Sequence, residues 1–362
     1  MMNLGRSAVR QAIRLVATVL PTFVLPIGAL AQTNTGIIEG FARVADTDAP
    51  MPFSLVRLLR GDTLRTRSQE TIQQTITNAD GRFRFASVQA GELRLQILRI
   101  GFHPMVSPVL RLGSGQDLRY DLRSEPLPVQ LPVVAVHGTS GCLGAASLAE
   151  DSVLTTLWTE ARKGVEIRRA FELRYRFTRS LQQVAQIRWR LRPDRKQVRV
   201  DTVVSEPDSV PAREQRLRSA HTAAGYGQGN SLIIPDEKEL LNENFLEDNC
   251  LETTIQRGVN SVGVRFRPVN PRRAGYAIRG TVWLDSASYL IRRIDYEHLD
   301  NGEAFSQLAI DYAPVRVGAS VLQLPATGKA TLHPRGPAHW MASAVTATLA
   351  YAYWGFEEVS SK

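Results

Sequence analysis

Short runs in which apolar and polar residues alternate recur along most of this 362-residue chain. Side chains of a β-strand point to opposite faces in turn, so a strand with one buried face alternates in this way, whereas a helix repeats about every 3.6 residues. The clearest runs are 37–44, 53–59, 77–85, 93–97, 109–112 and 118–122, followed by 171–177, 187–191, 197–204, 280–285, 290–296, 305–312, 322–324, 328–332 and 344–354. The pattern predicts a mainly β protein.

Only the segment 147–166 has a clear helical period. Its apolar residues recur three or four positions apart, and charged residues occupy the other positions. The apolar set is Val153, Leu154, Leu157, Trp158, Ala161 and Val165. Acidic residues near the start and basic residues near the end suit the helix dipole. Residues 141–358 are therefore predicted to form an antiparallel-sheet domain with one main α-helix.

The first 31 residues have the three parts of a secretory signal. Three arginines precede an apolar core of eleven residues and a small-residue cleavage site: Arg6, Arg10, Arg14, residues 15–25 and Ala29-Leu30-Ala31. The alternative is an uncleaved anchor, which Pro21 and Pro26 disfavour because proline breaks helices. We expect export to the periplasm or cell envelope, with an extracellular location as the alternative. Cleavage would lower the formal net charge of +9 by three.

Residues 35–125 carry a recognisable set of motifs. These are Gly40-Phe41-Ala42-Arg43-Val44, Ala79-Asp80-Gly81-Arg82-Phe83-Arg84-Phe85, Val88-Gln89-Ala90-Gly91-Glu92-Leu93 and Arg99-Ile100-Gly101-Phe102. In these motifs the chain resembles the carboxypeptidase regulatory-like domain, a transthyretin-like β-sandwich. The resemblance implies a non-catalytic accessory module, of the kind found beside peptidases and outer-membrane receptors and in exported proteins. It implies no peptidase activity.

The sequence makes separate predictions for two segments within residues 35–125 and for the segment that follows them. Residues 60–75 are polar and are expected to form a longer loop. Residues 78–81, with the sequence Asn-Ala-Asp-Gly, predict a hairpin turn rather than a calcium loop, because the full set of oxygen ligands is missing. The proline-rich residues 126–140 predict an extended linker.

The second half resembles uncharacterised exported proteins that carry the same module. The matching pieces are Cys142, residues 157–163, residues 245–250 and residues 280–285. At the level of fold, one helix against a broad antiparallel sheet is also similar to lipoprotein-carrier half-barrels. Cys142 and Cys250 are the only thiols, and a disulfide between them is the expected state in an exported chain. The alternative is a catalytic cysteine, which would need a nearby base.

Five arginines in two expected strands are the candidate binding residues: Arg174, Arg176, Arg188, Arg190 and Arg192. If the strands pair, these side chains share a face that suits phosphate or carboxylate. The alternative is a solvated face balanced by Glu172, Asp201 and Glu206. The partners we expect are an envelope lipid, an anionic glycan or an outer-membrane protein, with peripheral membrane contact and without nucleic acid.

Catalytic motifs are missing from the sequence. The six histidines form no metal-binding pair, and neither a nucleophile elbow nor a phosphate-binding loop occurs, so we expect no catalytic residues, no metal and no cofactor. The sequence therefore favours an exported, non-enzymatic binding or scaffolding protein of the cell envelope. The alternatives are a hydrolase of unrecognised type, whose carboxylates converge from distant strands, and a partner in envelope assembly. The oligomeric state is left open.

Overall fold

The structure is a computed structural model in which the described residues belong to one compact unit. It describes residues 34–60, 70–127, 151–190, 192–209, 227–228, 231–232, 237–241, 243–256, 260–270, 277–317, 320–333 and 342–359. The predicted signal segment 1–31 and most of the predicted linker 126–140 lie outside the described residues. The described residues are mainly β, which confirms the predicted fold class.

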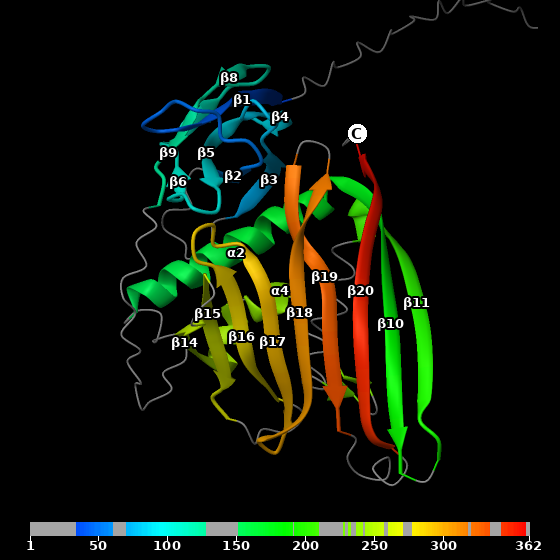
Figure 1. Cartoon of the computed structure of the whole chain (residues 1–362). Helices are drawn as coiled ribbons and strands as arrows, with labels where there is room; N and C mark the ends of the chain where they lie inside the picture. Colours follow the sequence, from blue (N-terminus) through cyan, green and yellow to red (C-terminus); the bar gives the residue numbers. More distant parts are fainter. Residues whose placement is uncertain are drawn as a thin grey trace, which may run out of the picture. The chain divides into compact units, whose positions relative to one another are not determined.

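Residues 35–124 form a β-sandwich of two small sheets (Figure 1). One sheet has the order β4-β1-β8, with β9 also paired to β1; the other has the order β3-β2-β5-β6, with β7 also paired to β5. The strands are β1 (Thr35–Val44), β2 (Leu55–Arg60), β3 (Thr71–Ile76), β4 (Arg82–Gln89), β5 (Gly91–Leu98), β6 (Met105–Val106), β7 (Leu110–Leu112), β8 (Asp117–Arg119) and β9 (Leu122–Ser124). Alternate side chains such as Ile38, Leu58 and Leu95 are fully buried and form its core.

Two predictions for the sandwich were wrong. Residues 71–76 form β3, an edge strand, because its threonine and isoleucine side chains suit a half-exposed strand although the segment is polar. The turn at 78–81 exists, and Asn78 Oδ1 accepts from the amides of Asp80 and Arg82 at 3.1 and 2.8 Å. However, the strands that it joins, β3 and β4, belong to different sheets, so the turn does not close a hairpin.

The rest of the described chain is dominated by a nine-stranded antiparallel sheet of order β11-β10-β20-β19-β18-β17-β16-β15-β14 (Figure 1). The strands are β10 (Tyr175–Trp189), β11 (Arg195–Ser205), β14 (Asn249–Gln256), β15 (Ser261–Pro268), β16 (Ala277–Asp285), β17 (Ile291–Asp300), β18 (Glu303–Val317), β19 (Ser320–Leu332) and β20 (Ala342–Glu358). The smaller elements are η2 (Pro207–Ser209), β12 (Gly227–Gln228), β13 (Ser231–Leu232), α4 (Glu237–Leu240) and α5 (Glu243–Asp248).

The main helix is α2 (Ser152–Glu172), which confirms the predicted helix and extends it by six residues beyond 166. Asp151 caps its start, because one carboxylate oxygen accepts from the amides of Val153 and Leu154, both at 2.9 Å. Residues 171 and 172 were predicted to begin a strand. Both instead belong to the last turn of the helix, where Phe171 stacks on Tyr175 with ring centroids 4.2 Å apart.

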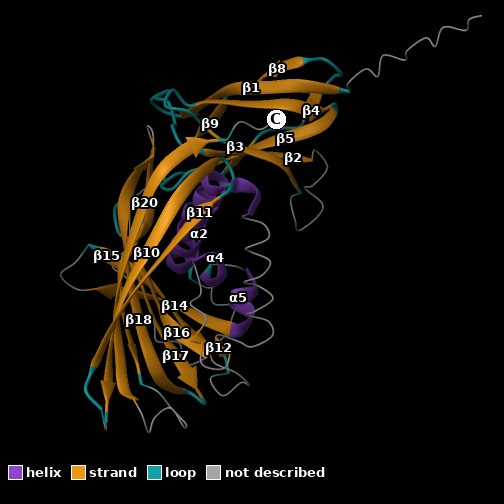
Figure 2. Ribbon diagram, turned by 90° about the vertical axis from the view of Figure 1, so that its right-hand side faces the viewer, coloured by secondary structure: helices purple, strands orange, loops and turns teal. Residues whose placement is uncertain are grey.

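The helices α2, α4 and α5 lie on one side of the sheet (Figure 2). We call this side the inner face and the opposite side the outer face. Leu157 and Trp158 of α2 pack with the inner-face residues Phe266, Val282 and Ile294 in the larger hydrophobic core. Because side chains alternate along a strand, the neighbours of these residues in sequence belong to the outer face.

A buried ion pair links α2 to the β-sandwich. Lys163 Nζ lies 2.5 Å from Glu160 Oε1, and both side chains are 3% exposed. Lys163 also donates to the Phe102 carbonyl at 2.5 Å, and Glu160 Oε2 accepts from the Gly101 amide at 2.8 Å. The loop that carries the Gly101-Phe102 motif is thus bonded directly to the helix.

Candidate functional site

The five predicted arginines lie in two groups that are far apart along one strand. The two strands that were expected to carry them are a single 15-residue strand, β10. Arg174 and Arg176 lie at its start, and Arg188, Arg190 and Arg192 lie at its end and in the following turn. At about 3.3 Å per residue, the two groups are roughly 40 Å apart.

Three of these arginines are paired with acidic side chains. Arg174 Nε donates to Glu358 at 2.7 Å, and its Nη1 also donates to the Ile76 carbonyl of the sandwich at 3.2 Å. Arg176 donates to Glu206 at 2.8 Å, and Arg188 lies 4.0 Å from Asp194. These contacts match the solvated, charge-balanced alternative better than a shared anion site.

Of the two cysteines in the predicted disulfide, one lies within the described residues. Cys250 is the second residue of β14 and is 4% exposed, and no described cysteine is a free thiol. Cys142 lies outside the described residues, so the Cys142–Cys250 disulfide stays a prediction.

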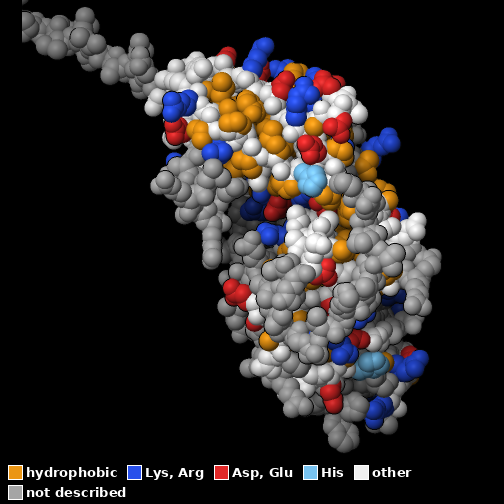
Figure 3. All heavy atoms as spheres, turned by 90° about the vertical axis from the view of Figure 1, so that its left-hand side faces the viewer, with side chains coloured by type: hydrophobic (Ala, Val, Ile, Leu, Met, Phe, Trp, Pro, Cys, Tyr) orange, Lys and Arg blue, Asp and Glu red, His pale blue; other side chains and the backbone are white. Residues whose placement is uncertain are grey.

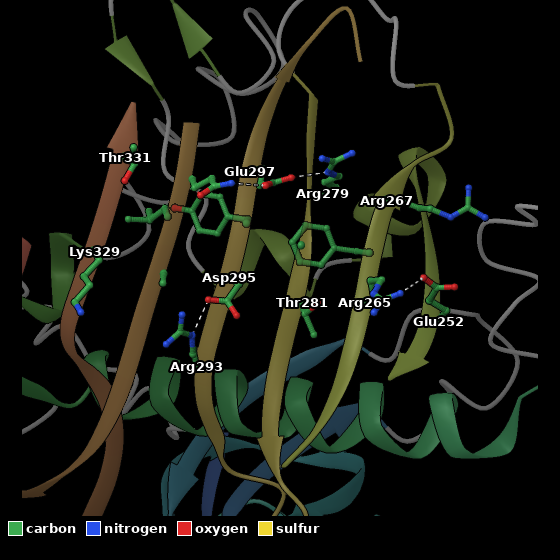
Figure 4. Close-up of a pocket in the computed structure, with 16 residues that line it drawn as sticks. Glu252, Arg265, Arg267, Arg279, Thr281, Arg293, Asp295, Glu297, Lys329 and Thr331 are labelled. Carbon is green, nitrogen blue, oxygen red and sulfur yellow. Dashed lines mark hydrogen bonds and ion pairs between the residues drawn. The ribbon is translucent and has the colours of Figure 1, made fainter. Parts of the chain in front are cut away.

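A different set of side chains comes together on the outer face of the sheet. A cavity of about 630 Å³ lies over β14 to β19 (Figure 4). Its lining has eight charged residues (Glu252, Arg265, Arg267, Arg279, Arg293, Asp295, Glu297, Lys329), three polar ones (Thr281, Gln307, Thr331), and Gly280 and Ala309. Phe266, Tyr296 and Leu308 also border the cavity, although they belong to the core on the inner face. We call it the outer-face pocket. Five cations face three acids, so its lining is net positive.

Strand register explains why these residues meet. Arg279 lies opposite Glu297, Glu297 opposite Gln307, and Gln307 opposite Thr331, so one row of polar side chains crosses four strands. A second, parallel row runs from Glu252 on β14 to Lys329 on β19 through five strand pairings. Residues directly opposite in antiparallel strands have their Cβ atoms about 5 Å apart, close enough for direct contact.

Hydrogen bonds fix several of these side chains. Glu297 accepts from Arg279 Nε at 2.6 Å and from Gln307 Nε2 at 2.9 Å, so both of its oxygens are engaged. Asp295 accepts from Arg293 Nε at 2.6 Å and from the indole Nε1 of Trp283 at 2.8 Å. Figure 4 shows Glu297 bonded to Arg279 on the neighbouring strand, and Asp295 bonded to Arg293 on its own strand.

A third pair closes the β14 side of the pocket. Arg265 Nη1 donates to Glu252 at 3.2 Å, and its Nη2 donates to the hydroxyl of Thr254 at the same distance. Burial acts to lower the pKa of Arg293, but hydrogen bonds from its guanidinium to Asp295 and Asp311 raise that pKa above its ordinary value. Hydrogen bonds to acidic side chains therefore hold the guanidinium groups of Arg265, Arg279 and Arg293 in place.

Two cations of the lining remain available to a ligand. Arg267 and Lys329 are both exposed, and neither has an acidic or hydrogen-bonding partner within the described part of the chain. They lie on β15 and β19, at opposite sides of the pocket. An anionic or polyhydroxylated ligand that lies between Arg267 and Lys329 could accept hydrogen bonds from these two cations at its ends. Its middle would lie over Arg279, Glu297 and Gln307, which offer both donors and acceptors.

Sequence reasoning missed this site. Two of its arginines alternate with apolar residues, as in Val264-Arg265-Phe266-Arg267, which marks an outward position on a half-buried strand. Many exposed arginines share that signal, and only the strand register shows which of them meet.

Among the described residues, no group of three or more His, Cys, Asp or Glu side chains could hold a metal ion. No helix in the described part of the chain combines the length and apolarity needed to cross a membrane. Charged side chains of both signs are interspersed on the face shown in Figure 3. On that face, the excess of arginine is not gathered into one positive patch.

Comparison with known proteins identifies the first part of the chain. Residues 37–125 match the family model of the carboxypeptidase regulatory-like domain, which confirms the predicted resemblance of residues 35–125. No curated protein matches the chain.

Similar solved structures are distant. They include a LolA superfamily protein from Nitrosomonas europaea, with 10% identity and a TM-score of 0.27 over 56% of this chain and 94% of that one. A 3-chlorocatechol 1,2-dioxygenase from Rhodococcus opacus 1CP gives 14% identity and a TM-score of 0.19, over 26% of this chain and 60% of that one. A 9R-lipoxygenase from Cyanothece PCC8801 gives 8% identity and 0.22, over 91% of this chain and 44% of that one. The chain thus spans less than two thirds of the dioxygenase and of the lipoxygenase. TM-scores this low carry no functional argument, so the similarity to lipoprotein carriers stays a prediction.

Proposed function

We propose that this chain is a non-enzymatic binding protein and that the outer-face pocket binds an acidic oligosaccharide. The observation that supports this proposal most strongly is the polar row Arg279, Glu297 and Gln307, flanked by Arg267 and Lys329, two cations without a partner among the described residues. Sugar hydroxyls need donors and acceptors at fixed positions, and acidic sugars also need cations. The pocket offers both on a rigid sheet, where side chains are positioned more precisely than on loops.

The alternative of a hydrolase is less well supported. Asp295 and Glu297 lie two residues apart on one strand and share a face, as a carboxylate pair for glycoside cleavage would. However, each already accepts two hydrogen bonds from neighbouring side chains, so both of its oxygens are engaged within the protein rather than turned towards a substrate. Binding without turnover is the function that this arrangement favours.

The binding proposal can be tested by calorimetry with the full chain. We expect an oligogalacturonide to bind and a neutral glucan of equal length to bind much more weakly. Arg279→Gln should weaken binding at least ten-fold, since a hydrogen bond to a charged group contributes about 1.5–3 kcal/mol. Lys329→Gln should reduce affinity and its dependence on salt, because it removes a charge without removing an internal hydrogen bond.

The matched control is Arg188→Gln, which removes an exposed arginine of the same sheet outside the pocket. It should leave affinity unchanged; an equal loss in Arg188→Gln and Arg279→Gln would place binding elsewhere. Vesicles that contain phosphatidylglycerol form a separate arm, and binding to them but not to oligogalacturonide would favour a lipid headgroup. Release of reducing ends from the bound oligosaccharide would instead support the hydrolase.

Export and the disulfide belong to the same proposal. We infer that residues 1–31 direct export and that Cys142 pairs with Cys250 in the oxidising compartment. Mass spectrometry of the exported protein should find its N-terminus at Gln32. Thiol labelling under denaturing, non-reducing conditions should find no free cysteine, and labelling of both cysteines would contradict the pairing.

A further inference from the structure

The two edges of the nine-stranded sheet differ in how well they are covered. At one edge, most described side chains of β14 are buried or half-buried, and Thr253 bonds to Asp151 before α2 at 3.3 Å. At the other edge lies β11, with nearly every residue exposed. No further strand pairs with β11 among the described residues, and Figure 1 shows it as the outermost strand.

The exposed edge strand also carries four exposed valines among its polar and charged residues. Val198, Val200, Val203 and Val204 are each more than 50% exposed. A long edge strand with unpaired backbone groups and exposed β-branched residues is a template for pairing with another strand, and soluble proteins normally protect such edges. The edge is therefore suited to recruit a partner strand.

We propose that β11 pairs antiparallel with β11 of a second copy of this chain, so that two sheets join across a two-fold axis at Val200. Residues that oppose each other must lie on the same face, so the axis must pass through a residue position. An axis at Val200 places Arg199 opposite Asp201 of the second copy, and Asp201 opposite its Arg199. Val198 then lies opposite Thr202, and the two Val200 side chains meet.

Neighbouring registers are penalised by like charges. An axis at position 199 would bring two Arg199 side chains together, and an axis at 201 would bring two Asp201 carboxylates together, both of which destabilise a pair of strands. Within one chain, Arg199 Nε already donates to Asp201 at 3.0 Å, so both groups are oriented on the same face. Charge complementarity thus selects a second copy of this strand as the partner.

The joined sheet keeps the two outer faces on one side. Each pocket is centred near β17, five strands from the edge, so the two pockets would lie roughly 50 Å apart along the sheet at about 4.8 Å per strand. A polymeric ligand could reach both. The dimer does not depend on the proposed ligand, and the tests below need no ligand.

Sedimentation equilibrium of the full chain tests the interface. We expect a dimer at micromolar concentration, and Arg199→Asp should weaken dimerisation at least ten-fold because it sets two carboxylates opposite each other. Arg199→Asp combined with Asp201→Arg should restore dimerisation, since the pair is reversed rather than removed. Circular dichroism should be unchanged in both variants. A chain that stays monomeric at 100-fold higher concentration, or a double variant as weak as the single one, would overturn the proposal.

Cysteine cross-linking tests the register. At a two-fold axis the Cβ atoms at position 200 lie about 5 Å apart, so Val200→Cys should give a dimer with a short bis-thiol reagent. Val198→Cys should not, because two copies of that position would be about 13 Å apart. Val321→Cys is the matched control, since Val321 and Val200 are both 59% exposed but Val321 lies on an interior strand. Equal cross-linking at positions 200 and 321 would show random collision and disprove the interface.

Discussion

The two faces of the nine-stranded sheet are built from the same strands and have opposite chemistry. On β16, Ile278 and Val282 belong to the buried core beneath α2, whereas their neighbours Arg279 and Thr281 line the outer-face pocket. A change of one position in sequence therefore moves a side chain from the part that stabilises the fold to the part that can bind. Along each strand, substitutions at inner-face positions should therefore change stability, and substitutions at the alternate, outer-face positions should change binding.

Truncating two adjacent residues on β15 is the strongest test of whether the two faces contribute differently to stability. Phe266 is 2% exposed, and its ring lies edge-on to that of Phe245 at 5.3 Å. Phe266→Ala should lower the free energy of unfolding by about 4 kcal/mol, through lost burial and the cavity left behind. Arg267→Ala, one position away on the outer face, should change it by less than about 0.5 kcal/mol. Urea unfolding of both variants checks this, and equal losses would show that the faces are not distinct.

The second comparison sets a buried ion pair against an exposed one. Lys163→Met should cost roughly 3 kcal/mol of unfolding free energy, because it leaves the buried Glu160 carboxylate without its cation. Arg279→Met should cost less than about 1 kcal/mol, since the Arg279 and Glu297 side chains are 49% and 26% exposed.

The double variant Glu160→Leu with Lys163→Met separates charge from packing. Removing both charges should recover much of the loss, because well-packed apolar residues often replace a buried pair without cost. If the double variant is as unstable as Lys163→Met, the hydrogen bonds to Gly101 and Phe102 matter more than the uncompensated charge.

The sequence predicted best where the signal is local. The strands β16 and β17 were expected from the alternation in 280–285 and 290–296, and the structure confirms both and pairs them antiparallel. The main helix was found from its period, although its last turn was not, because four alternating residues also fit the end of a helix. Both features depend on residues close together in the chain.

The features that failed depend on distant residues. β10 was predicted as two strands because its middle is half-exposed on both faces, which leaves little alternation to detect. The outer-face pocket was missed because Arg265, Arg279, Arg293 and Lys329 come from four different strands. Each looks like an ordinary surface cation until the register between the strands is known.

The smallest effect we predict concerns Asp285, which belongs to the outer-face positions of β16 but is 8% exposed. Burial acts to raise its pKa, but hydrogen bonds from Ser288 and Ala287 and the charge of Arg292 lower the pKa below its ordinary value. A carboxylate whose pKa is lower in the folded state stabilises the fold at neutral pH, and this contribution is lost as the pH falls below about 4.

Unfolding measured between pH 6 and pH 2.5 tests the sign of this shift. The wild type should lose more stability than Asp285→Asn over that window, so that the two curves converge at low pH. Arg292→Gln should lose less stability over this window than the wild type but more than Asp285→Asn. The reason is that Ala287 and Ser288 still donate to the Asp285 carboxylate at 3.1 and 2.8 Å. Parallel curves for wild type and Asp285→Asn would mean that the turn holds Asp285 by shape alone.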